Sequence, residues 1–193
     1  MKSLKLMLVL MLFSCCMYAQ DLTLYDLTCE HKSNPVGIDG MQPRLSWKIK
    51  ADGSNIMQKA YSVRVATDQK FSPSAMVWQS GKVSSGESIL IAYNGAQLKP
   101  CQRYYWQVKV WDNREKESKW SGTAYWETGL LNPSGWKAKW IELDADTLRY
   151  SPSPHFRKEF TITKNIISAR VYVTSHGFYE LHLNGKKVGD RVF

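Results

Sequence analysis

Aromatic side chains are the residues of this sequence best suited to recognise another molecule. All eight tryptophans lie after residue 20, and an exposed aromatic ring can stack through its apolar face on a sugar ring. Trp47 and Trp106 fall on the inward side of alternating segments, so we expect both in a core. Trp111 lies off the inward parity of its segment. We therefore take Trp111 and Trp78 as candidate contacts to a sugar or to another domain.

Motifs for catalysis or cofactor binding are missing from the sequence. It contains no Gly-rich phosphate loop, Cys-x-x-Cys, His-Glu-x-x-His or Gly-x-Ser-x-Gly. Asp144 and Asp146 form an Asp-x-Asp pair without the Gly and Glu of a calcium loop. The histidines lack zinc-type spacing: His31, His155, His176 and His182. We predict no catalytic residue, no metal and no cofactor.

The segments that carry the tryptophans have a period of two. Residues 60–66 and 104–111 alternate apolar and polar side chains, as half-buried antiparallel strands do. Further short strands are expected at 45–49, 77–79, 88–92 and 124–127, separated by turn-prone residues. Several short strands at this spacing indicate an all-β sandwich.

One local pattern specifies the kind of sandwich. Leu98, Pro100 and Tyr104 have the spacing of a tyrosine corner, where a tyrosine hydroxyl fixes the loop before a strand. Trp47 in an early strand and the Trp-Ser element at 118–121 agree with it. Residues 21–130 thus resemble a fibronectin type III, immunoglobulin-like domain.

A second set of β elements follows a turn-rich linker at 131–136. Strands are expected at 156–162, 169–174 and 179–183, and Asn184-Gly185 predicts a type I′ hairpin turn. A jelly roll needs about eight strands. We therefore expect 137–193 to be the incomplete start of a second sandwich, whose unpaired strand edges favour aggregation.

The amino terminus has the pattern of an export signal over residues 1–20. Lys2 and Lys5 precede an apolar run at 6–13, which is too short to span a membrane. Cleavage after Ala19 or Gln20 would give a soluble protein. The alternative is a lipoprotein box that anchors the chain at Cys15. In either case we expect an exported protein, periplasmic or secreted.

Charge and cysteine content limit the partners. The formal net charge is +9, but the basic residues are scattered rather than clustered, so we expect no nucleic-acid binding. A membrane is a partner only through an anchor at Cys15. Cys29 and Cys101 follow the signal segment. A single bridge between them is allowed outside the cytoplasm, and spacing alone does not settle it.

Several segments, in order, resemble bacterial α-L-rhamnosidases of glycoside hydrolase family seventy-eight. In the second half the similarity is to the family's lectin-like sandwich. The matching segments are 34–39, 43–47, 78–83, 105–112, 126–131, 156–160 and 177–190.

The resemblance implies a modular exported enzyme whose later (α/α)₆ barrel hydrolyses terminal α-L-rhamnose from glycosides or plant polysaccharides. Such a barrel would act by inversion, with one acidic residue as acid and another as base. Its partners would be rhamnose-containing glycans and the carboxyl-terminal domains of the same enzyme. The present residues end before the barrel, so we expect an amino-terminal part without hydrolytic activity of its own.

Two other functions stay open. A stand-alone surface glycan-binding or adhesion module would depend on Trp111 or Trp78. A purely structural spacer, which positions a catalytic domain or a partner, would have no affinity for sugars.

Overall fold

The computed structural model describes residues 22–143 and 153–189. The predicted signal segment with Cys15, as well as Asp144 and Asp146, lies outside the described residues. The chain forms two compact units, Met1–Lys139 and Trp140–Phe193. The predicted linker at 131–136 falls in the first unit and holds a short 3₁₀ turn, η2 (Pro133–Gly135). The domain boundaries deduced from the sequence stay predictions.

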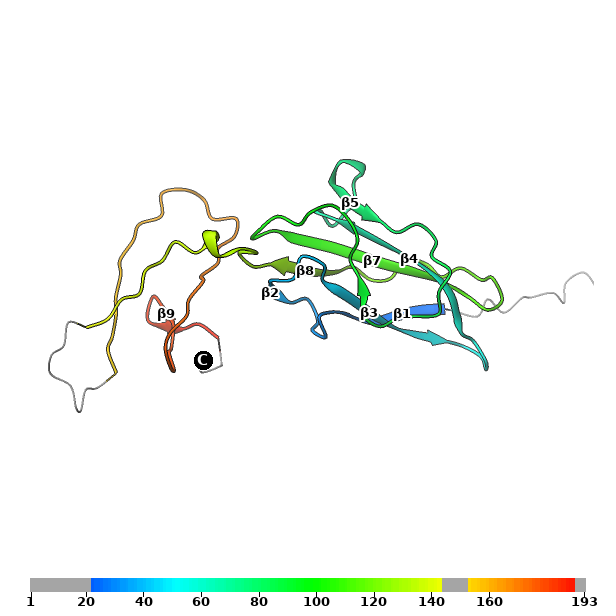
Figure 1. Ribbon diagram of the computed structural model, residues 1–193, viewed down its shortest axis with the longest axis horizontal. Coiled ribbons are helices and arrows are strands. Elements are labelled where there is room, and N and C mark those ends of the chain that lie inside the picture. Colours follow the sequence, from blue (N-terminus) through cyan, green and yellow to red (C-terminus); the bar gives the residue numbers. More distant parts are fainter. Residues whose placement is uncertain (1–21, 144–152, 190–193) are drawn as a thin grey trace, which may run out of the picture. The chain divides into compact units, whose positions relative to one another are not determined.

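The first unit is a sandwich of two sheets (Figure 1). The five-stranded sheet has the order β2-β8-β7-β4-β5, and the three-stranded sheet has the order β1-β3-β6. All neighbours are antiparallel except β2 and β8. The strands are β1 (Leu22–Cys29), β2 (Val36–Ile38), β3 (Arg44–Ala51), β4 (Gln58–Ala66), β5 (Met76–Gln79), β6 (Ile91–Ala92), β7 (Arg103–Asp112) and β8 (Ala124–Thr128).

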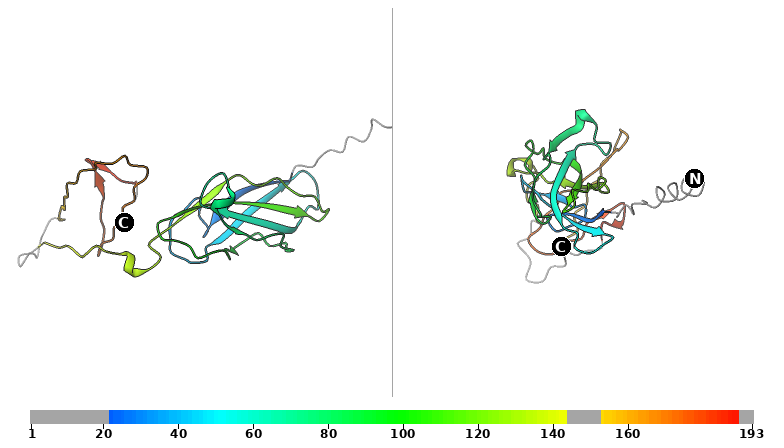
Figure 2. Two further views of the ribbon diagram at one scale, coloured as in Figure 1. Left: turned by 90° about the horizontal axis from the view of Figure 1, so that it is seen from above. Right: turned by 90° about the vertical axis from the view of Figure 1, so that its right-hand side faces the viewer.

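Helix is confined to two 3₁₀ turns in the described part of the chain, η1 (Pro73–Ala75) and η2. No helix there is long and apolar enough to cross a membrane. Figure 2 shows the long strands of the first unit from two further sides. The predicted all-β, immunoglobulin-like fold is confirmed.

Strand β7 shows why the alternating segments became strands. Every second side chain is buried, and Trp106, Val108 and Val110 are completely inaccessible to solvent. Its partner β4 is in register with it, so that Val63 lies opposite Val108. Alternation places one face of the sheet against the core and the other outside. The predicted facing of this strand is confirmed.

The core between the sheets is largely aromatic. Trp47, which is 2% exposed, donates a hydrogen bond from its indole Nε1 to Gln58 Oε1 at 3.0 Å, so this buried polar pair is matched. The predicted burial of Trp47 and Trp106 is confirmed. Members of the core include Trp47, Trp106, Trp126, Tyr93, Tyr104, Leu45, Val63 and Val65.

The tyrosine corner is present. The Lys99 backbone N–H donates to the Tyr104 hydroxyl at 2.8 Å. The Tyr104 ring stacks on Trp126, with centroids 5.5 Å apart. The Thr128 hydroxyl donates to the Lys99 carbonyl at 2.6 Å. The loop before β7 is therefore tied to both strands that follow it.

The sequence pattern missed β1 and β2, and two predicted strands were too long: 88–92 here, and 179–183 in the second unit, which is reduced to His182–Leu183. β1 does not alternate, because its pairing shifts between Tyr25 and Thr28, where Asp26 has a φ of 50°. The expected strand at 88–92 is reduced to β6. Its first part leaves the ladder since Leu90, with a φ of 56°, donates its N–H to the Ser46 hydroxyl at 2.9 Å.

The second unit contains one hairpin among its described residues. β9 (His182–Leu183) pairs with β10 (Lys186–Lys187). Asn184 and Gly185 both have positive φ, 49° and 77°, which confirms the predicted type I′ turn.

The strands predicted at 156–162 and 169–174 are wrong for this structure, which has no strand there (Figure 1). An extended segment gains stability only when neighbouring strands satisfy its backbone groups. No described residue pairs with these two segments. Their apolar side chains are exposed, with Phe160 at 65% and Val171 at 63%.

The two described cysteines are not joined by a disulfide, so the bridge that the sequence allowed is not formed. Cys29 ends β1 and is 1% exposed, whereas Cys101 is exposed in the loop before β7. Burial, with a smaller contribution from the charge of Glu30, raises the pKa of the Cys29 thiol to about 12. A thiol reacts through its thiolate, so Cys29 is both inaccessible and unreactive.

Removal of the corner hydroxyl tests the tyrosine corner. We expect Tyr104→Phe to lower the free energy of unfolding by about 1–2 kcal/mol, because the Lys99 N–H loses its acceptor. Urea denaturation measures this change. The control is Tyr25→Phe on β1, where the ring is 49% exposed, and we expect it to stay within about 0.5 kcal/mol of the parent. Equal stability of the two variants would contradict the assignment.

Alkylation of the native chain tests the state of the cysteines. With iodoacetamide at neutral pH, peptide mass spectrometry should find Cys101 modified and Cys29 protected. Cys29 should react only after denaturation, since both burial and its raised pKa oppose reaction. Recovery of a peptide pair linked through Cys29 and Cys101 would refute this prediction.

Candidate functional site

Trp111 lies on the outer side of β7, as its parity predicted, and is half-buried. Two ammonium groups lie over its ring: Lys82 Nζ is 4.6 Å and Lys109 Nζ is 5.0 Å from the centroid. A cation at this distance is attracted by the ring electrons. The indole therefore already has neighbours from its own chain. Its role as a sugar or interdomain contact stays a prediction.

Trp111 belongs to a longer array that we call the cation–aromatic row, formed by Phe71, Arg64, Trp120, Lys109, Trp111 and Lys82. The Arg64 guanidinium carbon lies 4.5 Å from the Phe71 centroid and 4.2 Å from that of Trp120. Lys109 Nζ lies 5.2 Å from the Trp120 ring. Cations and rings thus alternate along the outer face of the five-stranded sheet.

Strand register and a serine-anchored segment position the row. Arg64 on β4 lies opposite Gln107 on β7, and its Nε donates to Gln107 Oε1 at 3.0 Å. The hydroxyls of Ser118 and Ser121 accept hydrogen bonds from two backbone N–H groups of β7 at 3.0 Å and 3.1 Å. They hold Trp120 beside Arg64. The sequence pattern contained the Trp-Ser element, but it did not predict the cation–aromatic row.

Burial and pairing moderate the charge of the row. Burial lowers the pKa of the Arg64 guanidinium. Lys109 pairs with Glu117, and Lys82 Nζ lies 3.6 Å from a Glu115 carboxylate oxygen. Carboxylates thus pair with two of the three cations in the row, so most of its positive charge is compensated and it does not resemble a strong anion-binding patch.

Trp78 lies apart from the row, on the edge strand β5. It is half-buried and meets Tyr93 edge to face, with centroids 5.2 Å apart. One part of Trp78 thus belongs to the core, while another lines a groove of about 500 Å³. Trp111 does not line this groove. The structure therefore does not bring the two candidate tryptophans together.

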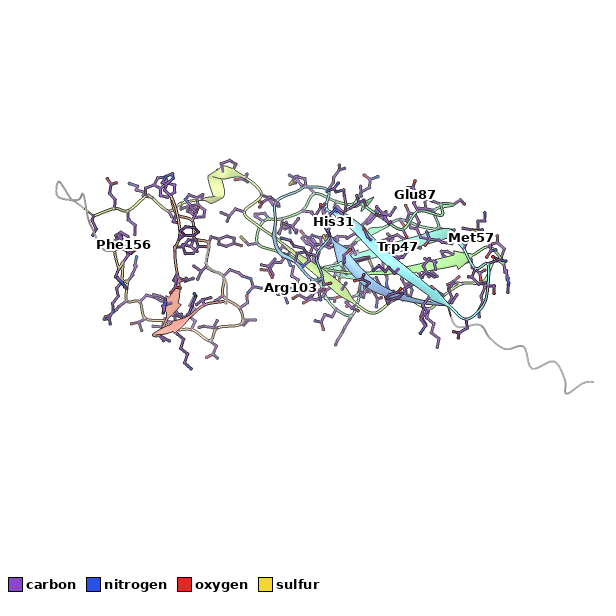
Figure 3. The ribbon with its side chains drawn as sticks, turned by 90° about the horizontal axis from the view of Figure 1, so that it is seen from below. His31, Trp47, Met57, Glu87, Arg103 and Phe156 are labelled. Atoms are coloured by element: carbon purple, nitrogen blue, oxygen red, sulfur yellow. The ribbon has the colours of Figure 1, made fainter. Side chains whose placement is uncertain are left out.

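The groove lies where the edge strands β5 and β6 of the two sheets approach each other. Beside Trp78 it is lined by Tyr61 of β4 and by polar side chains, among them Gln42, Gln79, Glu87 and Asn94. Figure 3 shows Glu87 on a long edge of the first unit, well apart from Arg103. Sequence reasoning missed Tyr61, because strand alternation marks it only as a core residue.

The histidines do not form a metal or catalytic cluster in the described ranges. No group of three or more metal-ligating side chains occurs there. In the second unit His176 stacks on Trp140, with centroids 4.1 Å apart. His182 Nε2 lies 3.3 Å from a Glu180 oxygen, and Lys187 Nζ lies 2.6 Å from the other. Lys187 and His182 together lower the pKa of the Glu180 carboxyl.

Loss of the central guanidinium tests the cation–aromatic row. Arg64→Leu should lower the free energy of unfolding by about 1–2 kcal/mol, because it removes two ring contacts and the bond to Gln107. Lys82→Leu, at the 47% exposed end of the row, should change it by no more than about 0.5 kcal/mol. Thermal and urea unfolding provide the measurement. A larger loss for Lys82→Leu than for Arg64→Leu would contradict the central position of Arg64.

Two family models match the chain. The model described as "Rha78A-like, N-terminal immunoglobulin domain" matches residues 24–132. The model described as "Alpha-L-rhamnosidase N-terminal domain" matches residues 164–193. The first covers the sandwich, and the second covers the hairpin of β9 and β10.

Curated proteins similar to the chain include an α-L-rhamnosidase of Formosa agariphila. It is 40% identical over 184 residues, which cover 83% of this chain and 19% of that protein. An α-L-rhamnosidase of Streptomyces avermitilis is 34% identical over 181 residues, which cover 82% of this chain and 18% of that protein. The chain thus spans about a fifth of the length of these relatives.

Solved structures show the same similarity. The Streptomyces avermitilis α-L-rhamnosidase complexed with L-rhamnose has a TM-score of 0.61 and 43% identity, covering 63% of this chain and 12% of that one. The α-L-rhamnosidase of Dictyoglumus thermophilum has a TM-score of 0.59 and 41% identity, and the match covers 62% of this chain and 14% of that one. The family resemblance deduced from the sequence is confirmed, and the chain belongs to the family of Rha78A-like N-terminal immunoglobulin domains.

Proposed function

We propose that these residues are the amino-terminal accessory β-domains of an exported α-L-rhamnosidase. The observation that carries the proposal is the unequal coverage: this chain matches the rhamnose-complexed Streptomyces enzyme over 63% of its own length but over 12% of the enzyme's. The shared part is an immunoglobulin-like sandwich. Most of that enzyme lies outside this match, and we place the hydrolytic site there.

The electrostatics of the described carboxylates support a non-catalytic role. Glycoside hydrolysis by inversion needs a protonated carboxylic acid and a second carboxylate about 6.5–9.5 Å away. Glu30 is instead held by Arg44 at 2.7 Å, and hydrogen bonding to that guanidinium lowers the pKa of Glu30. Glu127 pairs with Arg103 at 3.0 Å. A carboxyl with a lowered pKa is a poor general acid.

We also propose where the protein is located and which substrate the complete enzyme hydrolyses. Residues 1–20 would direct export, ending in a soluble protein or in a lipid anchor at Cys15. The complete enzyme would release terminal α-L-rhamnose from glycosides or plant polysaccharides by inversion. The sandwich would position the catalytic domain, a role that suits a core closed by the tyrosine corner and an outer face braced by the cation–aromatic row.

An activity assay with the chain alone tests the accessory role. We expect no release of the chromophore from an aryl α-L-rhamnoside, because we place the hydrolytic carboxylates in the part of the enzyme outside this match. The Streptomyces avermitilis enzyme serves as the positive control. Rhamnose release by the pure chain at a rate proportional to its concentration would overturn the non-catalytic assignment.

Sequencing the source DNA beyond codon 193 is the complementary test. An open frame that continues for several hundred codons with the pattern of a helical barrel would establish the front end of a rhamnosidase. A stop codon at that point would refute the enzyme proposal, and it would leave a β-protein whose function must lie in binding.

A further inference from the structure

We propose that the groove between β5 and β6 binds the ring of a neutral sugar, with Trp78 as the stacking surface. The groove is lined by residues of the described sandwich, so this inference goes beyond the accessory role and does not depend on it. Its volume of about 500 Å³ falls within the range of roughly 300–1,000 Å³ typical of small-molecule sites.

The indole of Trp78 is held in place before any ligand arrives. It packs against the buried ring of Tyr93, whose hydroxyl donates to the Ala96 carbonyl at 2.7 Å. A Cβ at Gly95 would approach Trp78 Cβ to 2.5 Å, so the chain passes this side chain at close range. A pre-ordered ring loses little conformational entropy on binding, and its half-exposed surface can stack on the C–H face of a pyranose.

Tyr61 contributes the hydroxyl of a mostly buried ring to the groove. The side chain is 8% exposed, and its ring meets Trp47 at a centroid distance of 5.3 Å. Among the described residues its hydroxyl makes no hydrogen bond. Burial, and after it the charge of Glu87, raises the pKa of this phenol. A tyrosine hydroxyl at the edge of an apolar wall both donates and accepts, and a sugar hydroxyl in the groove can be its partner.

The rim of the groove carries groups suited to vicinal hydroxyls. Gln42, Gln79 and Asn94 are exposed, and their side-chain amides make no hydrogen bonds within the described chain. An amide both donates and accepts, as a hydroxyl pair requires. Glu87 is the one charged residue of the described lining. Its negative charge favours a neutral sugar over a uronate or a sulfated sugar.

The wall that carries Glu87 is fixed to the sandwich. The buried Gln58 side chain donates from Nε2 to the carbonyls of Ser85 and Glu87 at 3.1 Å and 2.6 Å. The Trp47 backbone N–H donates to the Ser88 carbonyl at 3.0 Å. The groove therefore has rigid walls on both sides, which favours binding without rearrangement.

NMR titration of the full chain tests this inference. The probes are L-rhamnose and D-galactose as neutral sugars, with D-glucuronate as the charged comparator. The ¹⁵N-indole signal of Trp78, assigned with Trp78→Phe, should shift saturably with a neutral sugar. D-glucuronate should bind about tenfold more weakly.

Three variants separate the groove from other surfaces. Tyr61→Phe and Glu87→Gln should each weaken neutral-sugar binding about fivefold, and Glu87→Gln should also remove the discrimination against D-glucuronate. Trp136→Phe, at a tryptophan that is 39% exposed and does not line the groove, is the matched control and should leave the Kd unchanged. Unfolding curves of all variants confirm that they are folded.

The opposite results overturn the inference. They are no saturable shift with either neutral sugar, tighter binding of D-glucuronate than of the neutral sugars, or equal weakening by Trp136→Phe and Glu87→Gln. None of these measurements involves hydrolysis. A negative sugar-binding result would therefore not affect the rhamnosidase proposal. Equally, a negative result for the rhamnosidase proposal would not affect the proposed sugar groove.

Discussion

The register between β4 and β7 is the constraint on which both faces of the five-stranded sheet depend. Val63 and Val108 lie opposite each other, and their inward side chains fill the core. Arg64 and Gln107 lie opposite each other, and their outward side chains support the cation–aromatic row. Side chains alternate with a period of two, so a slip by one residue would exchange the two faces. It would expose Trp106 and bury charged groups. Packing in the core and contacts in the cation–aromatic row therefore stabilise the same pairing of β4 with β7, from opposite faces of the sheet.

The large rings of the core leave two buried indole N–H groups without hydrogen bonds among the described residues. The indole N–H groups of Trp106 and Trp126 are buried and make no hydrogen bond within the described part of the chain. An unmatched buried donor costs about 1–3 kcal/mol. Tyr93 and Tyr104 contact Trp126 with centroid distances of 5.8 Å and 5.5 Å. Ring packing and area burial therefore have to offset that cost, and the tyrosine corner keeps one of these rings in place.

Two surfaces of the sandwich differ in what they can do. The row on the sheet face is satisfied by its own ion pairs and ring contacts, so its stabilising role is complete within the chain. The groove at the edge, between β5 and β6, has Tyr61 and amide groups that are not matched internally. The proposed accessory domain would thus combine a rigid body with a place to hold a sugar. The two candidate tryptophans lie on these two different surfaces.

The amino-acid sequence by itself determined the all-β class, the facing of β7, the tyrosine corner and the type I′ turn at Asn184-Gly185. These features depend on alternation or on local backbone geometry, which neighbouring residues decide. Tertiary structure alone decided that β1 is a strand despite its irregular pairing, that Trp120 and Arg64 stack, and that Tyr61 reaches a groove. Each of these depends on segments far apart in sequence that meet only when both sheets pack. For the same reason the segments 156–162 and 169–174 alternate as strands do but form none, because a strand exists only with a partner beside it.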